Sequence, residues 1–189
     1  EDSFFHFEIF GDNYHTEPII GFAWGTKGQL YASTDTSLLQ TPIFKEFLEK
    51  TPLKVYDFKR AKVLLSHLGI TLQTPAFDSR LAKYLLSTVE DNEISTIASL
   101  YSQIALPLDE VVYGKGAKKA IPEKGVLLEH LARKVAVLLD TEELMVEQLQ
   151  AHDQLDLLYN MEQPLAAVLA KMEIAGIKVE RQTLQDMQV

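Results

Sequence analysis

The sequence predicts an α/β sandwich in which a mixed β-sheet is flanked by helices. Two observations support this fold class. The chain begins with three strand-like segments in succession, and a strand–helix unit followed by several helices comes after them. With strands first and helices after them, the helices bury their apolar faces against the sheet that the strands form. A length of 189 residues, with 47% hydrophobic residues, is enough for one well-packed core and a short appendage.

Aromatic and β-branched residues predict the strands. The first segment is rich in phenylalanine, and the next two are its expected antiparallel partners, joined by a turn at Thr26-Lys27-Gly28. Four strands can be placed, at residues 4–10, 18–24, 29–32 and 53–58. We expect a sheet of about five strands in total.

Capping residues and apolar spacing predict the helices. Thr41 with Pro42 begins the first helix, Gly69 ends the second, and Asp78 caps the third. The expected helices cover residues 42–50, 59–68, 79–86, 94–104, 125–151 and 155–175, and a long loop covers residues 105–124. One stripe in the fifth helix predicts core packing: Val126, Leu127, Leu131, Val135, Leu138 and Leu139.

The charge distribution restricts the partners of the chain. Its net charge is −9, and no Lys or Arg occurs between Val135 and Ala170, so that acidic helical region is not a DNA-binding face. The basic residues Lys115, Lys118, Lys119 and Lys124 cluster in a glycine-bearing loop. This cluster is either a phosphate contact or an ordinary solvated loop. Gly114-Lys115-Gly116 lacks the second half of a phosphate-binding P-loop.

The cellular setting follows from what the sequence lacks. The absence of cysteine excludes disulfides and thiolate chemistry and suits the cytoplasm, which we take as the expected location. The apolar run at residues 19–24 is too short to span a bilayer, and we expect no membrane partner. Glu1 in place of Met, and an ending inside an apparent helix, suggest a fragment of a longer protein.

Five motifs in order carry a resemblance to a known family. They are Phe5-His6-Phe7-Glu8, Asp57-Phe58-Lys59-Arg60-Ala61, Ala76-Phe77-Asp78, Tyr113-Gly114-Lys115-Gly116, and the stretch from Met161-Glu162-Gln163-Pro164-Leu165 to Gly176-Ile177-Lys178-Val179. Together they resemble the 3′–5′ exonuclease domain of bacterial DNA polymerase I and, in the last stretch, the start of its polymerase domain. The likeness covers essentially the whole chain and is greatest to the Bacillus and lactic-acid-bacterial branch. It implies a ribonuclease H-like (DnaQ-like exonuclease) fold.

The resemblance also implies where a two-metal site would lie. Such sites use oxygen ligands to hold two divalent ions about 3.5–4 Å apart. In active members a strand supplies an Asp and a Glu two residues apart, and two helices supply an Asp each, with a water-orienting Tyr four residues before the last Asp. The corresponding residues here are His6, Glu8, Ala61, Lys134 and His130. Only one carboxylate of four is retained.

These replacements predict that the exonuclease site is inactive. Alanine offers no ligand, and a lysine repels a dication by an energy on the order of several kcal/mol at 4 Å. We therefore expect no catalytic residue, metal or cofactor in this segment. The favoured function is a structural platform for an adjoining polymerase domain. The alternatives are a weak metal-dependent exonuclease with a rearranged site, and a binding module that retains the cleft.

Three further expectations concern single residues and boundaries. Glu8 is either a solvated strand-end residue or the partner of Lys134, Lys59 or Arg60, in a pair only partly buried. A trio of His6, Glu8 and His130 also has donor types suited to zinc or manganese.

The exonuclease-like domain is expected at residues 1–155 and the start of the polymerase domain at 156–189, with 176–189 least supported. The implied partners are that polymerase domain and, through the parent protein, DNA, with Mg²⁺ for the parent polymerase.

Overall fold

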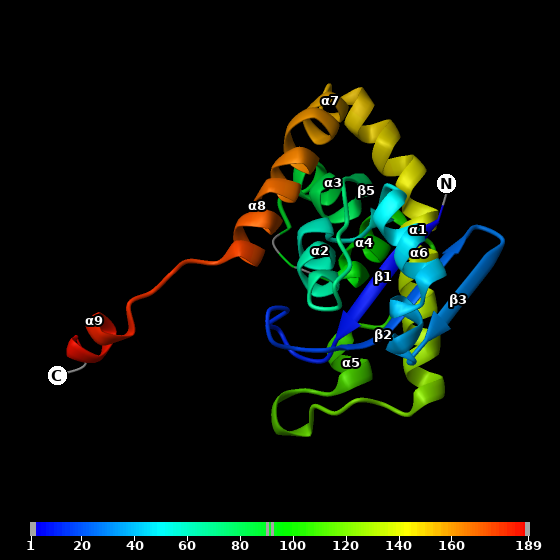
Figure 1. Cartoon of the computed structure of the whole chain (residues 1–189). Helices are drawn as coiled ribbons and strands as arrows, with labels where there is room; N and C mark the ends of the chain where they lie inside the picture. Colours follow the sequence, from blue (N-terminus) through cyan, green and yellow to red (C-terminus); the bar gives the residue numbers. More distant parts are fainter. Residues whose placement is uncertain (1–2, 90, 92, 188–189) are drawn as a thin grey trace.

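The computed structural model describes residues 3–89, 91 and 93–187 and shows a five-stranded sheet between helices (Figure 1). Its strands are β1 (Phe4–Ile9), β2 (Ile19–Thr26), β3 (Gln29–Ser33), β4 (Leu53–Val55) and β5 (Pro75–Asp78). Its helical elements are η1 (Thr36–Gln40), α1 (Pro42–Lys50), α2 (Phe58–Ser66), α3 (Ser79–Leu86), α4 (Ile94–Tyr101), α5 (Asp109–Tyr113), η2 (Gly116–Lys118), α6 (Lys124–Ala151), α7 (Leu155–Leu157), η3 (Leu158–Glu162), α8 (Gln163–Ala175) and α9 (Arg181–Asp186).

The sheet is mixed, with strand order β3-β2-β1-β4-β5. The pairs β1–β2 and β2–β3 are antiparallel, whereas β1–β4 and β4–β5 are parallel. The hairpin between β2 and β3 turns at Lys27 and Gly28. The mixed sheet of five strands confirms the predicted fold class, and β1 is its central strand.

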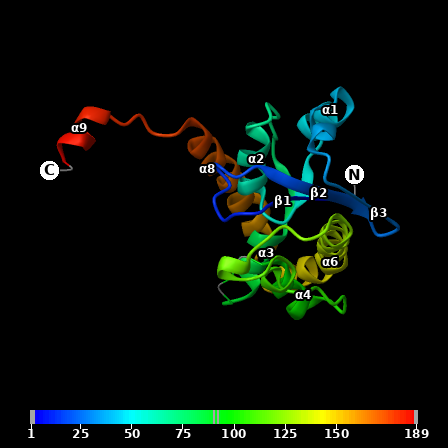
Figure 2. The same cartoon turned by 90° about the horizontal axis from the view of Figure 1, so that it is seen from below.

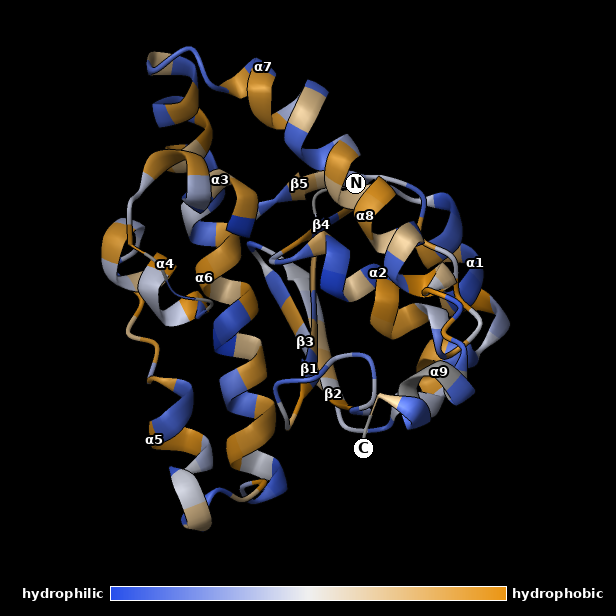
Figure 3. Ribbon diagram, turned by 90° about the vertical axis from the view of Figure 1, so that its left-hand side faces the viewer, coloured by the Kyte–Doolittle hydropathy of each residue, from blue (hydrophilic) through white to orange (hydrophobic). Residues whose placement is uncertain are grey.

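Both faces of β1 are buried, because helices cover the sheet on each side (Figures 2 and 3). Alternate residues of a strand point to opposite faces. Phe4 belongs to the apolar cluster under α3, α4 and α6, whereas Phe5 and Phe7 belong to the cluster under α1 and α2. His6 and Glu8 share the face of Phe4 and therefore lie beneath α6.

Two strand predictions differ from the structure. β4 ends at Val55 rather than residue 58, because the Asp57 carboxylate accepts a hydrogen bond from the Arg60 amide and so caps α2. The fifth strand, β5, was expected only as a helix start. It has four residues and begins with Pro75, so it carries almost no alternation for a pattern to detect.

Several helix predictions also need correction. The first and third expected helices match α1 and α3, but α4 ends at Tyr101 rather than at residue 104. The expected loop at 105–124 contains α5 and η2. The expected helix at 155–175 is divided by a π-helical turn, η3. Val126 was assigned to the core stripe but is 47% exposed, because it lies on the solvent side of α6.

No helix among the described residues is both long enough and apolar enough to cross a membrane. Beyond α8 the chain runs through extended residues to α9, away from the sheet (Figure 1). Ile177 is 91% exposed and Val179 is 55% exposed, as expected for a segment with few packing partners. The segment predicted to be least supported, residues 176–189, also includes residues 188 and 189, which lie outside the described residues.

Candidate functional site

The first part of the site is the pair His6 and Glu8 on β1. Two residues apart on a strand, they project from one face, and His6 Nε2 lies 3.1 Å from Glu8 Oε2. Their exposed fractions are 6% and 4%. The interpretation of Glu8 as a solvated residue is therefore wrong: β1 is central, and α6 covers this face of it.

Helix α6 contributes His130 and Lys134, which lie one turn apart on its buried face. The Lys134 ammonium donates a hydrogen bond to Glu8 Oε2 at 2.5 Å. This contact confirms the predicted pair. The pair was expected to be partly buried, which is wrong, since the two side chains are only 4% and 5% exposed.

A second carboxylate, Asp109, completes this cluster from α5. Its Oδ1 lies 2.8 Å from Lys134 Nζ and 2.8 Å from His130 Nε2. Sequence reasoning missed Asp109 because residues 105–124 were interpreted as loop. The available signal was the run Pro107-Leu108-Asp109-Glu110, since acidic residues after a proline are typical of a helix start.

The charges of this cluster balance. Glu8 and Asp109 are the two carboxylates, Lys134 bonds to both, and the Arg60 guanidinium lies 3.8 Å from Glu8 Oε1. Burial lowers the pKa of His6, so its ring is neutral at pH 7 and gives Glu8 a hydrogen bond rather than a charge. Leaving His130 aside, two negative groups are thus matched by two positive groups.

The pKa shifts agree with this balance. Burial acts to raise the pKa of Glu8. The attraction of Lys134 and the hydrogen bonds to the carboxylate together outweigh burial, so the pKa falls below its usual range. Burial acts to lower the pKa of Lys134, but Glu8 and Asp109 raise it. Both groups are therefore ionised at neutral pH, and their ion pair persists.

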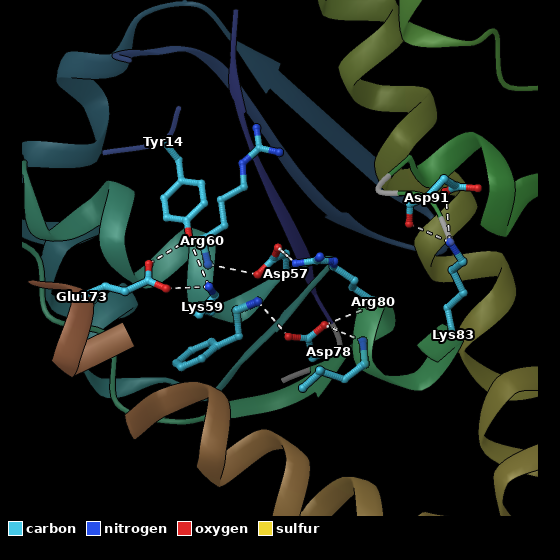
Figure 4. A network of polar contacts seen from close by, with 11 residues as sticks. Tyr14, Asp57, Lys59, Arg60, Asp78, Arg80, Lys83, Asp91 and Glu173 are labelled. Atoms are coloured by element: carbon cyan, nitrogen blue, oxygen red, sulfur yellow. Dashed lines mark hydrogen bonds and ion pairs between the residues drawn. The ribbon is translucent and has the colours of Figure 1, made fainter. Parts of the chain in front are cut away.

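The remaining candidate residue, Ala61, contributes no polar side-chain atom. It lies in α2, 5% exposed, in the apolar cluster under α1 and α2. Lys59, another expected partner for Glu8, instead contacts Glu173 and Tyr14 (Figure 4). Of the two alternative partners, Lys59 and Arg60, only Arg60 lies near Glu8 in the structure.

The residues present do not fit the two divalent ions that the resemblance implies. Three of the four carboxylate positions hold His6, Ala61 and Lys134, and the Lys134 ammonium already uses an oxygen of Glu8. His6, Glu8 and His130 do not form a three-donor site, because His130 Nε2 is bonded to Asp109. The described part of the chain has no group of three or more His, Cys, Asp or Glu side chains placed to hold a metal.

A cleft of about 690 Å³ lies beside this cluster, between the loops that follow β1 and α5. Seven acidic and five basic residues line it, so its lining is negative overall. The basic-loop residues Lys115 and Lys119 reach its rim, where Lys115 pairs with Glu110 and Lys119 lies 3.9 Å from Asp12. The rim lysines are therefore partly neutralised by neighbouring acids, and the cleft does not present a basic groove.

Comparison with known proteins agrees with the resemblance. The family described as "DNA polymerase I, ribonuclease H-like domain" matches residues 5–141. DNA polymerase I of Streptococcus pneumoniae is 65% identical over 188 residues, which is 100% of this chain and 21% of that protein. DNA polymerase I of Bacillus subtilis is 39% identical over 188 residues, covering 98% of this chain and 21% of that protein.

A solved structure shares the fold at low sequence identity. The "POL domain of Pol1 from M. smegmatis complex with DNA primer-template and dNTP" has a TM-score of 0.78 and 21% identity, covering 100% of this chain and 31% of that one. The chain thus spans about a fifth of the curated relatives' length. From the family match and the two relatives we conclude that this chain belongs to the DNA polymerase I family and that its residues 5–141 match the ribonuclease H-like domain of that family.

Proposed function

We propose that this domain hydrolyses no nucleic acid and acts as a structural platform for the adjoining polymerase domain of a DNA polymerase I, in DNA replication and repair. The observation that carries the proposal is the position of Lys134. Its ammonium is buried, 2.5 Å from Glu8 and 2.8 Å from Asp109. A fixed positive charge lies where the chemistry of the active family needs divalent cations.

The energetics support this conclusion. A dication brought to Glu8 has to displace Lys134 or share a carboxylate with it, and like charges at about 4 Å repel by on the order of several kcal/mol even at a surface-like dielectric. Displacing Lys134 would leave a buried ammonium without its main partner. Ala61 provides no compensating ligand on the α2 side.

The platform role is supported by the way the domain continues into the rest of the relatives' chains. The matched family region ends at residue 141, yet the relatives align over essentially the whole chain. Helix α8, beyond that region, packs on α2 and β5. Within the whole polymerase we expect DNA and Mg²⁺ to bind outside this segment.

A nuclease assay tests the catalytic half of the proposal. The whole polymerase chain is incubated with end-labelled single-stranded DNA and Mg²⁺ or Mn²⁺, beside a proofreading-competent relative as positive control. The expected result is no release of 3′ nucleotides above that of a Glu8→Ala variant. Metal-dependent release that Glu8→Ala abolishes would establish the alternative function, a weak exonuclease.

A heat-challenge assay tests the other half of the proposal, the role of the domain as a structural support for the polymerase domain. Lys134→Met weakens this domain without touching the polymerase domain, so the variant polymerase should lose primer extension at a lower temperature than the wild type. Lys27→Met removes an exposed ion pair with Glu143 and is the matched control, expected to behave as wild type. Equal heat resistance of wild type and Lys134→Met would contradict a supporting role.

A further inference from the structure

Strand β3 forms an open edge of the sheet. It stands first in the strand order, and among the described residues it pairs with β2 alone. Figures 1 and 2 both place β3 at the margin of the molecule, with no described element beyond it. An edge strand without a neighbour presents a row of unused backbone groups, and an added strand can pair with them.

The register of the hairpin shows which backbone groups are unused. Thr26 pairs with Gln29 across the two-residue turn, and the pairing continues along β3 without a register shift. In an antiparallel ladder, hydrogen-bonded pairs alternate with non-hydrogen-bonded pairs, and the pair that closes a two-residue turn is hydrogen-bonded. Every second residue of β3 therefore bonds to β2. The N–H and C=O groups of the two residues between them, Leu30 and Ala32, point away from the sheet.

This edge lacks the features that usually protect an open strand. Proteins commonly place a lysine, a proline or a bulge on such an edge to prevent pairing. β3 has the sequence Gln-Leu-Tyr-Ala-Ser, with no charged residue and no proline, and its pairing with β2 contains no bulge. Its two large side chains, Leu30 and Tyr31, are 41% and 44% exposed. An edge of this composition is suited to receiving a strand.

The side of the edge that faces α1 is apolar. Tyr31 stacks on Trp24, with ring centroids 5.2 Å apart, and Trp24 meets Phe44 of α1 edge-on at the same distance. Two further apolar residues of α1, Ile43 and Phe47, are 83% and 40% exposed. A strand added beside β3 would therefore bury apolar side chains on this side.

The opposite side of the edge, which faces α6, is acidic. α6 packs on β3, and the hairpin residue Lys27 lies 3.3 Å from Glu143 of that helix. Asp140, Glu143 and Glu147 are exposed on this half of α6. No Lys or Arg occurs between Val135 and Ala170, so the chain itself supplies few positive charges to this side. A strand added here would therefore be favoured by basic side chains that point toward α6.

We propose that β3 is the docking edge for an extended, basic peptide of a partner protein, which adds a strand to the sheet. Side chains of a strand alternate between its two faces, so apolar and basic residues in alternation meet both sides at once. A second copy of this chain fits poorly, because its α6 would bring acidic residues against acidic residues, and each copy has a net charge of −9. Such a partner is independent of the platform role.

Peptide binding to the whole polymerase chain tests the proposal. The probe is a fluorescein-labelled peptide of seven residues in which lysine and valine alternate, and its binding is followed by fluorescence anisotropy. The control peptide has the same composition, with the lysines and the valines in separate blocks. We expect the alternating peptide to bind saturably and at least about tenfold more tightly than the block peptide, since only alternation presents one kind of side chain to each face. Deuterium uptake at residues 29–33 should fall on binding, because added hydrogen bonds protect the amides.

Two variants locate the binding. Ala32→Pro removes an N–H that points away from β2, and prolines are tolerated at such edge positions. It should weaken binding of the alternating peptide at least about tenfold. Glu147→Lys reverses one charge on the acidic side and should weaken binding about threefold or more at low salt, with the difference shrinking as salt is added. Asp12→Lys is the charge-matched control. Asp12 is fully exposed on the loop beside the cleft, so its variant should bind as the wild type does.

Three outcomes would overturn the proposal. They are equal or absent binding of the two peptides, wild-type affinity in both Ala32→Pro and Glu147→Lys, and unchanged deuterium uptake at residues 29–33 when the peptide is bound. Thermal unfolding shows whether each variant is folded, and Glu147→Lys with the exchange measurement still decides if Ala32→Pro is not. None of these results depends on the nuclease assay or on the heat challenge.

Discussion

Substitution of Lys134 by methionine should be the most damaging single change at the ion-pair cluster. It removes the main counter-charge of Glu8, a carboxylate only 4% exposed, while its neutral neighbour His6 and the Arg60 guanidinium at 3.8 Å remain. Breaking one side of a buried pair costs about 3–5 kcal/mol. Because Arg60 partly compensates, we expect about 3 kcal/mol, or a midpoint about 6–12 °C lower for a domain of this size.

Urea unfolding followed by the fluorescence of Trp24 measures this loss, because Trp24 is the single tryptophan and stacks on Phe22 in the sheet. The pH dependence identifies the cause. In the wild type the pKa of Glu8 is lowered, so its stabilising contribution is present above its usual value of 4.5 and is lost below it. The difference between wild type and Lys134→Met should therefore shrink as the pH falls through 4.5.

The double variant Glu8→Gln/Lys134→Met supplies the internal control. It removes both charges at once, so it should recover most of the stability that Lys134→Met loses. The exposed pair of Lys27 with Glu143 provides the comparison, and Lys27→Met should cost at most about 1 kcal/mol. A loss below about 1 kcal/mol in Lys134→Met, or a loss that does not shrink as the pH falls below 4.5, would refute the assignment of Glu8 as a buried, ionised partner.

Three more predictions concern residues outside that pair. Burial lowers the pKa of His6, so below pH 6.5 the unfolded chain binds a proton that the folded chain does not, and stability falls. His6→Gln should flatten this slope in urea unfolding below pH 6.5, and an unchanged slope would exclude His6 as its source. Gln163→Ala leaves the buried backbone amide of Asp78 without its acceptor and should lower the free energy of unfolding by about 1–3 kcal/mol in the same assay. An unfolding free energy equal to that of the wild type would show that α8 is held by its alanines alone. Gly114 has a φ of +81°, and a Cβ at this position would lie 2.6 Å from the Lys118 carbonyl oxygen. Gly114→Ala should therefore lower the free energy of unfolding by at least about 1–3 kcal/mol. Thermal unfolding monitored by circular dichroism measures this loss, and an unshifted midpoint would show that the loop relaxes freely.

The central elements of the fold were predictable because their patterns are long. β1, β2 and α6 each carry enough apolar residues to determine their type and their buried face. β5 and α5 were not predicted, since four and five residues are too few for a period to emerge. The turn between β2 and β3 was correctly placed by its glycine.

The site was predictable only in part, for a physical reason. The family resemblance implied which residues correspond to the expected ligands, and the contact of Lys134 with Glu8 confirms one predicted pairing. Burial was mispredicted because no local pattern shows that a polar pair in a central strand lies beneath a long helix. Asp109, which is 21 residues before His130 in the chain, enters the cluster only through the path of the intervening loop.

The charge arrangement around Glu8 also means that no single substitution would create a metal site here. An aspartate introduced at position 134 alone would place a third carboxylate beside Glu8 and Asp109 and remove the ammonium that both contact. Three like charges, two of them at the buried positions 8 and 134, would destabilise the domain before any metal could bind, and Ala61 would still offer no ligand to a cation. A two-metal site at this position would therefore need several substitutions made together, because each single change first destabilises the domain.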